Sequence, residues 1–186
     1  MLKRFIDILL SLVILFFTFP IFLWLMVLIK IDSQGSIIFK QKRIGKNGKE
    51  FTLYKLRTMD KNTPAYELKP RDDDPRITRV GKFLRETGLD ELPQLFNVLE
   101  GQMSLVGPRP EIPFIVKNYT EEQRQRLKVK PGITGLWQIS GKTKQPILEN
   151  LQYDFDYINN QSMLLDFKIL VKTFKFSLNN IYHLFR

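Results

Sequence analysis

The longest apolar run of the chain extends from Ile8 to Ile29. Only Ser11 and Thr18 are polar among these 22 residues. A helix rises about 1.5 Å per residue, so the run is long enough to cross a hydrocarbon layer of about 30 Å. It is longer than the apolar region of a signal peptide and continues directly into Lys30, so we expect it to be retained. The pattern predicts a membrane-embedded helix near the N-terminus.

Pro20 lies near the middle of this run and removes one backbone donor from any helix that contains it. The two limbs on either side would each measure roughly half the hydrocarbon thickness. Both flanks are basic, with Lys3 and Arg4 before the run and Lys30 after it, so the charges favour no single spanning orientation. These residues are compatible with a helix-break-helix that enters and leaves one leaflet, but a kinked spanning helix is the commoner arrangement.

Two β-type runs follow between residues 36 and 59, on either side of Asn47 and Gly48. This dipeptide favours a tight hairpin, because both central positions of such a turn need positive φ. Lys55 and Arg57 lie at the end of the second run. Taken alone, their charges are typical of a solvated or lipid-facing surface.

Residues 60–76 are polar, interrupted by proline and without periodicity, which predicts a loop. Asp72, Asp73 and Asp74 are consecutive in this loop. Consecutive side chains do not readily converge on one ion, so we interpret the three acids as solvated rather than as a metal site.

A short amphipathic helix is predicted next, then a turn at Thr87 and Gly88, then a helix of about ten residues that ends before Gly101. Proline is tolerated only in the first turn of a helix, so Pro93 fixes where the second helix begins. Asp90 and Glu91, hereafter the acid pair, therefore belong at or just before its N-terminus. An ordinary N-cap role for Asp90 is the simplest interpretation of its position alone.

The last third of the chain contains two further features. Residues 131–142 form a glycine-rich, turn-rich segment around Trp137, which is a candidate lining of a pocket and matches neither the P-loop nor the dinucleotide fingerprint. Residues 167–185 place apolar and aromatic side chains at helical spacing with lysines off that stripe. This amphipathic basic helix either covers the core or lies on a membrane surface, and its aromatic content favours the membrane.

Charge and composition narrow the classes of function. The net charge is +10, and residues 1–59 carry +7 of it, beside the apolar run, where anionic lipid headgroups are the simplest partners. No nucleic-acid motif accompanies this charge, so we expect no nucleic-acid partner. The chain has no cysteine, which excludes disulfides, thiolate metal sites and cysteine nucleophiles, and its single histidine, His183, makes a catalytic triad improbable.

Five segments together identify a family. They are "KRFIDILLSLVILFFTFP", "FTLYKLRTM", "DPRITRVGKFLRETGLDELPQLFNVLEGQMSLVGPRP", "KPGITGLWQISG" and "YDFDYINNQSMLLDFKIL". In this order they resemble the monotopic phosphoglycosyl transferases of the bacterial sugar transferase family, in their minimal, catalytic form. The resemblance implies an α+β, mostly helical single domain with a small β-hairpin and amphipathic surface helices. It also implies a re-entrant membrane hairpin over residues 1–31, broken at Pro20, and a catalytic domain over residues 32–186. Relatives of this kind often have a serine before that proline, where this chain has Phe19, which leaves Thr18 as the nearest hydroxyl.

The resemblance further implies an activity. A phosphosugar would pass from a UDP-sugar to polyprenyl phosphate, with release of UMP, at the cytoplasmic face of the bacterial inner membrane. Asp90 matches the family's aspartate nucleophile, which forms a covalent phosphosugar-aspartate, and Glu91 completes the acid pair. Splitting the transfer into two displacements lets two substrates of different solubility use one site in turn. Membrane lipids would be further partners.

Charge neutralisation is central to such a reaction, because a carboxylate must approach a diphosphate. We expect Mg²⁺, bound by oxygen ligands that include Asp90, together with guanidinium groups. Arg85 and Arg109 become phosphate ligands by the resemblance, and Lys55 and Arg57 are weaker candidates for the same task. The alternative is a non-catalytic, membrane-anchored adaptor that binds anionic lipid or a glycan-assembly partner.

Overall fold

This computed structural model describes residues 1–63, 74–143 and 145–184, with side chains as far as Tyr182. Asp72, Asp73 and the side chain of His183 therefore lie outside the described residues, and their predicted roles stay predictions.

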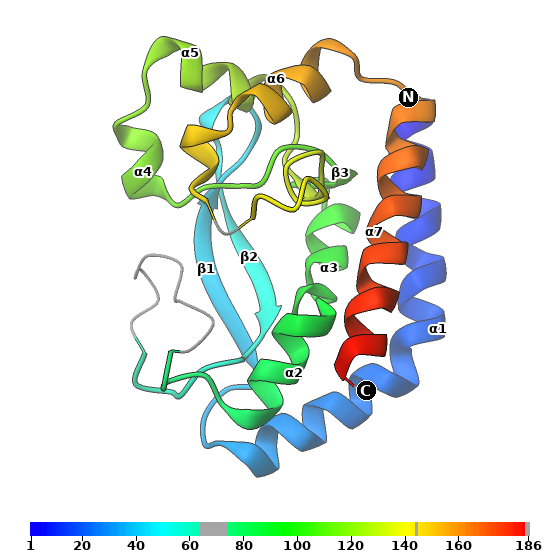
Figure 1. Ribbon diagram of the computed structural model, residues 1–186, viewed down its shortest axis with the longest axis vertical. Coiled ribbons are helices and arrows are strands. Elements are labelled where there is room, and N and C mark those ends of the chain that lie inside the picture. Colours follow the sequence, from blue (N-terminus) through cyan, green and yellow to red (C-terminus); the bar gives the residue numbers. More distant parts are fainter. Residues whose placement is uncertain (64–73, 144, 185–186) are drawn as a thin grey trace.

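The apolar run forms α1 (Leu2–Asp32), a helix that contains Pro20 and bends sharply (Figure 1). Pro20 has no N–H for the carbonyl of Phe16, and the Thr18 hydroxyl donates to the Ile14 carbonyl at 2.7 Å. A proline and a hydroxyl bonded in this way are both common causes of helix bending. Most apolar side chains of α1 are exposed, and its length and apolar composition are sufficient to cross a membrane. The re-entrant path itself stays a prediction.

The N-terminal limb of α1 is attached to the domain by polar contacts. Asp7 is buried and accepts hydrogen bonds from the Ser104 hydroxyl at 2.8 Å and from the Leu105 N–H at 3.2 Å. Lys3 forms an ion pair with buried Asp166 at 2.5 Å. These directional contacts fix the limb against the domain while its outer face stays apolar.

The predicted hairpin consists of β1 (Ile38–Ile44) and β2 (Glu50–Leu56), which pair antiparallel with Gln41 opposite Leu53. A 3₁₀ turn joins the strands, and Asn47 and Gly48 have φ of 58° and 74°. Both angles are positive, as the dipeptide predicts.

The segment that holds the acid pair runs through α2 (Arg79–Thr87), a 3₁₀ turn (Leu89–Glu91) and α3 (Gln94–Leu99). Because α3 has six residues, it is shorter than the predicted helix of about ten. After α3, β3 (Ser104–Val106) pairs in parallel with β4 (Gly132–Thr134), a second small sheet that the sequence did not indicate. The backbones of this pair approach so closely that a Cβ on Gly132 would lie 2.1 Å from the nitrogen of Gly107.

The remaining helices are α4 (Pro113–Lys117), α5 (Glu121–Arg124), α6 (Gln152–Asn159) and α7 (Met163–Leu184). Of α7, Asp166 and Ile169 are buried, whereas Phe167 and Phe174 are about two-thirds exposed. The inner face of α7 thus covers the core, as one of the two alternatives predicted, whereas its outer apolar face is exposed and its contact with a membrane stays a prediction.

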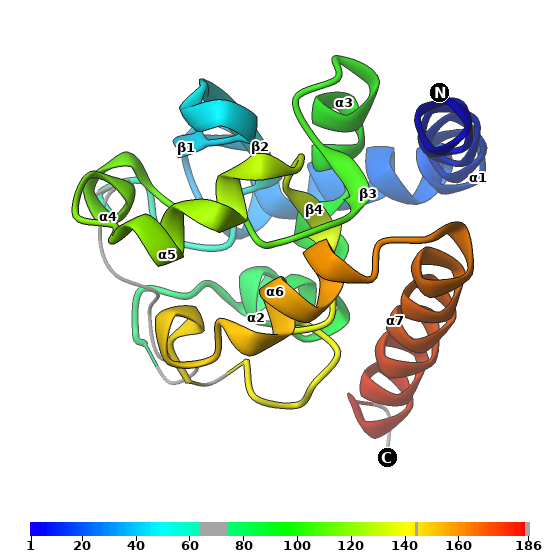
Figure 2. The same ribbon diagram turned by 90° about the horizontal axis from the view of Figure 1, so that it is seen from above.

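The elements pack around one main core in which α3, the hairpin, β3 and α7 meet; its buried residues are Phe51, Leu53, Leu95, Val98, Met103, Leu105, Val106, Tyr157 and Ile169. Seen from above, β3 and β4 lie between α3 on one side and α6 on the other (Figure 2). The first limb of α1 and α7 lie on the same side of the molecule, and α7 leads away from α1 toward its C-terminal end (Figure 2). The predicted α+β fold, mostly helical with a small β-hairpin, is confirmed, whereas the division between residues 31 and 32 stays a prediction.

Candidate active site

The acid pair lies in the 3₁₀ turn that precedes α3. Gly88 ends α2 with φ of 76°, and the chain then turns back so that Asp90 is buried, 8% exposed. Pro93 occupies the N-cap position of α3, and no side chain caps that end. Asp90 is therefore not an N-cap, and its carboxylate is directed toward a cation instead.

That cation is Lys55, near the end of β2. Its Nζ lies 2.6 Å from Oε1 of Glu91 and 3.5 Å from Oδ2 of Asp90. All three side chains are at most about one-fifth exposed. A lysine that bridges two adjacent carboxylates reduces the repulsion between them and keeps positive charge where an anion would enter.

Arg109 approaches the same pair from the loop after β3. Its Nη1 lies 3.4 Å from Oε1 of Glu91, so Glu91 contacts two cations. Pro108 and Pro110 flank Arg109 and restrict the backbone on both sides. The contact uses one nitrogen of the guanidinium fork, which leaves the rest of the fork to bind an anion.

These charges affect the two carboxyls differently. Burial acts to raise the pKa of Glu91, but Lys55 and Arg109 outweigh it and lower that pKa to about 2. Burial raises the pKa of Asp90 above its usual value, opposed by Lys55 and reinforced by the neighbouring Glu91. Glu91 is thus held ionised by its partners, whereas Asp90 is the less solvated and more reactive carboxylate when ionised.

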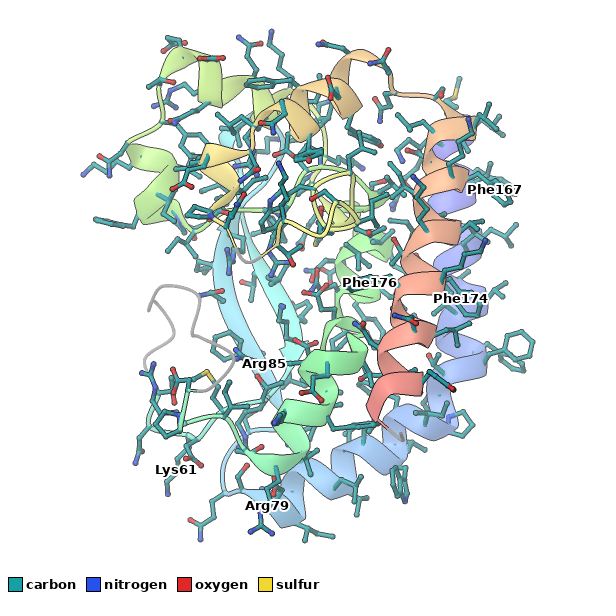
Figure 3. All side chains as sticks on the ribbon, in the orientation of Figure 1. Lys61, Arg79, Arg85, Phe167, Phe174 and Phe176 are labelled. Atoms are coloured by element: carbon teal, nitrogen blue, oxygen red, sulfur yellow. The ribbon has the colours of Figure 1, made fainter. Side chains whose placement is uncertain are left out.

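Arg85 projects from α2 toward the residues that follow β2 (Figure 3). Its Nε donates to the Thr58 hydroxyl at 3.1 Å, and its positive charge favours the ionised form of Asp90. Arg85 therefore lies within electrostatic range of the acid pair, on a different element from Lys55 and Arg109.

For Arg57 the sequence predicted phosphate binding, but in the structure its side chain contacts Ser33. The side chain is 7% exposed, and its Nη2 donates to the Ser33 carbonyl at 2.7 Å and to the Ser33 hydroxyl at 2.9 Å. Arg57 directly follows β2, and its N–H still donates to the Ile37 carbonyl at 2.8 Å, but its side chain reaches α1 and not the acid pair that Lys55 contacts. The charge of Arg57 thus lies at the C-terminal end of α1, where cations are favourable.

Trp137 is another candidate that the structure places differently. It is buried, 5% exposed, in the turns that follow β4, so its ring contributes to packing. Its predicted role as a pocket lining is not supported by this position.

A buried network behind Arg109 escaped the sequence analysis. Arg126 donates to the Arg109 carbonyl at 2.9 Å, to Asp154 at 2.5 Å and to the Tyr119 hydroxyl. Arg43 donates to the Pro110 carbonyl at 3.0 Å. Residues so far apart in sequence, each unremarkable in its own segment, show no pattern that could have grouped them.

Mg²⁺ is compatible with the acid pair. Within residues 1–63, 74–143 and 145–184, no cluster of three or more Asp, Glu, His or Cys side chains offers a complete protein cage. Mg²⁺ is usually held by one or two carboxylates together with substrate phosphates and water, and Asp90 and Glu91 are such carboxylates. The donors present therefore fit an ion that enters with a phosphorylated substrate.

Comparison with known proteins identifies the family. The family described as "Bacterial sugar transferase" matches residues 1–180. The exopolysaccharide production protein ExoY of Sinorhizobium fredii is 40% identical, and the alignment covers 92% of this chain and 83% of that protein. The UDP-glucose:undecaprenyl-phosphate glucose-1-phosphate transferase of Klebsiella pneumoniae is 42% identical over 92% of this chain, which spans only 39% of that protein. The undecaprenyl-phosphate galactose phosphotransferase of Salmonella typhimurium is 40% identical, over 94% of this chain and 40% of its own length. The chain belongs to the bacterial sugar transferase family.

Proposed function

We propose that this protein transfers a sugar 1-phosphate from a UDP-sugar to polyprenyl phosphate, with release of UMP. The names of the Salmonella and Klebsiella relatives describe this class of transfer to undecaprenyl phosphate. The observation that carries the proposal is the buried Asp90 carboxylate, which is surrounded by Lys55, Glu91 and Arg109. A nucleophile in a cationic site is what attack on a diphosphate requires.

The transfer proceeds in two displacements. In the first, a carboxylate oxygen of Asp90 attacks the β-phosphorus of the UDP-sugar, and the bond from that phosphorus to the bridging oxygen breaks. UMP leaves with the electron pair, and a phosphosugar-aspartate remains. In the second, a phosphate oxygen of polyprenyl phosphate attacks the same phosphorus and expels the Asp90 carboxylate, giving polyprenyl-diphosphate-sugar.

The surrounding side chains have distinct tasks in these steps. Arg109 binds oxygens of the diphosphate and stabilises the charge that develops on UMP. Arg85 adds positive charge from α2. Lys55 holds Glu91 ionised and limits repulsion as the substrate approaches. Mg²⁺ would be held by the acid pair and supplies charge neutralisation at the diphosphate when bound.

The membrane is part of the proposal because the acceptor is a lipid. The bent, largely exposed α1 would enter and leave one leaflet at Pro20, so that both ends of the helix meet the cytoplasmic face of the bacterial inner membrane. Polyprenyl phosphate would then present its phosphate at the depth where the acid pair lies.

The first experiment measures UMP release from a panel of UDP-sugars by purified protein with Mg²⁺ and polyprenyl phosphate. Turnover that requires the lipid and is lost in Asp90→Asn supports the proposal and names the sugar. The variant Glu91→Gln tests the role of the second carboxylate alone, because it leaves the Asp90 nucleophile in place. Silence across the panel from folded protein would contradict the proposal and favour the membrane-anchored adaptor.

A further inference from the structure

Asn97 is a fully buried amide on α3 that the mechanism above does not use, with 0% of its surface exposed. Its Nδ2 donates to the Thr52 carbonyl and to Oε1 of Gln102, each at 2.7 Å. Its Oδ1 accepts the N–H of Tyr54 at 3.1 Å. Every polar atom of this side chain is therefore paired, and two of its bonds reach a strand more than 40 positions earlier in the sequence.

Those two bonds lie on the free edge of β2. The strand pairs with β1 along one edge, and its sheet has two strands, so the groups on the other edge need partners from elsewhere. Thr52 offers a carbonyl and Tyr54 an N–H on that edge, and the single amide of Asn97 satisfies both. The side chain takes the place of a peptide group in a third strand.

This contact sets the register of β2 on α3. Apolar packing of Leu53 against Leu95 and Val98 brings the elements together, but such packing is non-directional. Hydrogen bonds to two defined backbone atoms select one position along the strand. Side chains alternate along a strand, so Lys55 shares the α3-facing side with Leu53, and a slip of one residue would turn it away.

We propose that Asn97 is a positioning residue: its amide fixes β2 on α3 and thereby places the ammonium of Lys55 against the acid pair. The catalytic part of this inference rests on the proposed function, whereas the structural part rests on the contacts alone. Loss of the Asn97 hydrogen bonds would weaken one contact in particular, because the short Lys55–Glu91 contact depends on the backbone position that Asn97 sets.

The test is a double-mutant cycle between Asn97→Leu and Lys55→Gln. Leucine matches asparagine approximately in size and removes all three bonds without adding a charge. If Asn97 acts through Lys55, Asn97→Leu lowers kcat for UMP release by about tenfold or more when Lys55 is present, and by less than about twofold in the Lys55→Gln background. The KM for the UDP-sugar changes little. Equal factors in both backgrounds would overturn the proposal.

A second measurement needs no substrate. The same double-mutant cycle is measured on the free energy of unfolding at pH 7, where Lys55→Gln should cost clearly less stability in the Asn97→Leu background than in the wild type, because the short Lys55–Glu91 contact is already lost there. Additive losses at the two positions would refute the positioning role. If the wild type releases no UMP, the proposed function fails, while this measurement still decides the role of Asn97.

Asn150 provides a matched control. It is also buried, 3% exposed, and its Nδ2 donates to Gln145 and to the Pro146 carbonyl. Asn150→Leu removes a similar amide, and its effect on kcat should be the same with and without Lys55. Asn97→Ala serves as the second variant if leucine prevents folding.

Discussion

At the scale of single residues, the two carboxyls of the acid pair differ in the cations that they contact. Glu91 contacts both Lys55 and Arg109, and their attraction outweighs the effect of burial. Asp90 makes the longer contact to Lys55 and keeps a raised pKa, because burial outweighs the attraction of that cation. The two neighbouring carboxyls are thereby separated in their chemistry, one structural and anionic, the other available for attack.

This difference predicts how stability depends on pH. The pKa of Glu91 is lowered from 4.5 in the unfolded chain to about 2 in the folded protein. Its contribution is therefore fully present above about pH 4.5 and is lost as the pH falls toward 2. We expect Glu91→Gln to lower the melting temperature at pH 7 and to flatten its decline between pH 5 and about pH 3, measured by thermal unfolding in detergent.

Glu121 provides the control for this measurement, because its side chain is 97% exposed and its contact to Arg124 measures 3.8 Å. Glu121→Gln should leave the acid-side decline unchanged. If wild type and Glu91→Gln decline in parallel, the two cations do not hold Glu91 in the way the geometry indicates.

At the scale of elements, the pairing of β3 with β4 positions the loop after β3 that carries Arg109. Its tight parallel pairing is possible because Gly107 and Gly132 have no side chain at the point of closest approach. We expect Gly132→Ala to destabilise the protein by about 3 kcal/mol or more, because the backbone of Gly107 would have to move. Chemical denaturation would measure the loss.

Gly48→Ala is a useful comparison for that variant, since a Cβ there meets nothing within 4 Å. Its positive φ of 74° limits the expected cost to about 1 kcal/mol. Comparable losses at the two positions would show that close approach is not what glycine provides at β4.

The bend of α1 is the second prediction at this scale. Pro20→Leu restores a backbone donor and removes the clash with the preceding turn, so we expect a straighter helix that spans the membrane. Because the chain has no cysteine, a single cysteine at Lys3 reports which side of the membrane the N-terminus occupies. In cells it should be protected from a membrane-impermeant thiol reagent in the parent and become labelled from outside in Pro20→Leu. Identical labelling would contradict the role of Pro20.

At the scale of the whole molecule, two apolar surfaces lie on one side. The first limb of α1 and α7 lie on the same side of the molecule, joined near their N-terminal ends by the Lys3–Asp166 ion pair and diverging toward the C-terminal end of α7 (Figure 2). Phe167 and Phe174 lie on the outer side of α7 (Figure 3). We expect the exposed apolar face of α7 to contact the membrane together with α1.

Single cysteines test the contact. A fluorophore on Phe174→Cys should be quenched by spin-labelled lipid in bilayers that contain anionic lipid, and one on Lys175→Cys much less, because adjacent helical positions face different directions. Equal, weak quenching at both positions would show that water or protein covers this face.

Particular residues show what the sequence by itself determined. The long apolar helix follows from 22 nearly uninterrupted apolar residues, its bend from Pro20, and the hairpin turn from Asn47 and Gly48. Pro93 marks where α3 begins, and the family follows from motifs contiguous along the chain. All of these depend on local backbone restrictions or on periodicity, which a sequence displays directly.

Only the tertiary structure decided which charges meet. Lys55 reaches the acid pair while Arg57, two residues later, binds the end of α1, because α3 packs near Leu53 whereas α1 packs near Leu56. Asn97, Arg126 and Asp154 acquire their partners from segments far away in the sequence. Such contacts depend on packing in three dimensions, where non-directional burial brings elements together and hydrogen bonds between distant segments then select one arrangement.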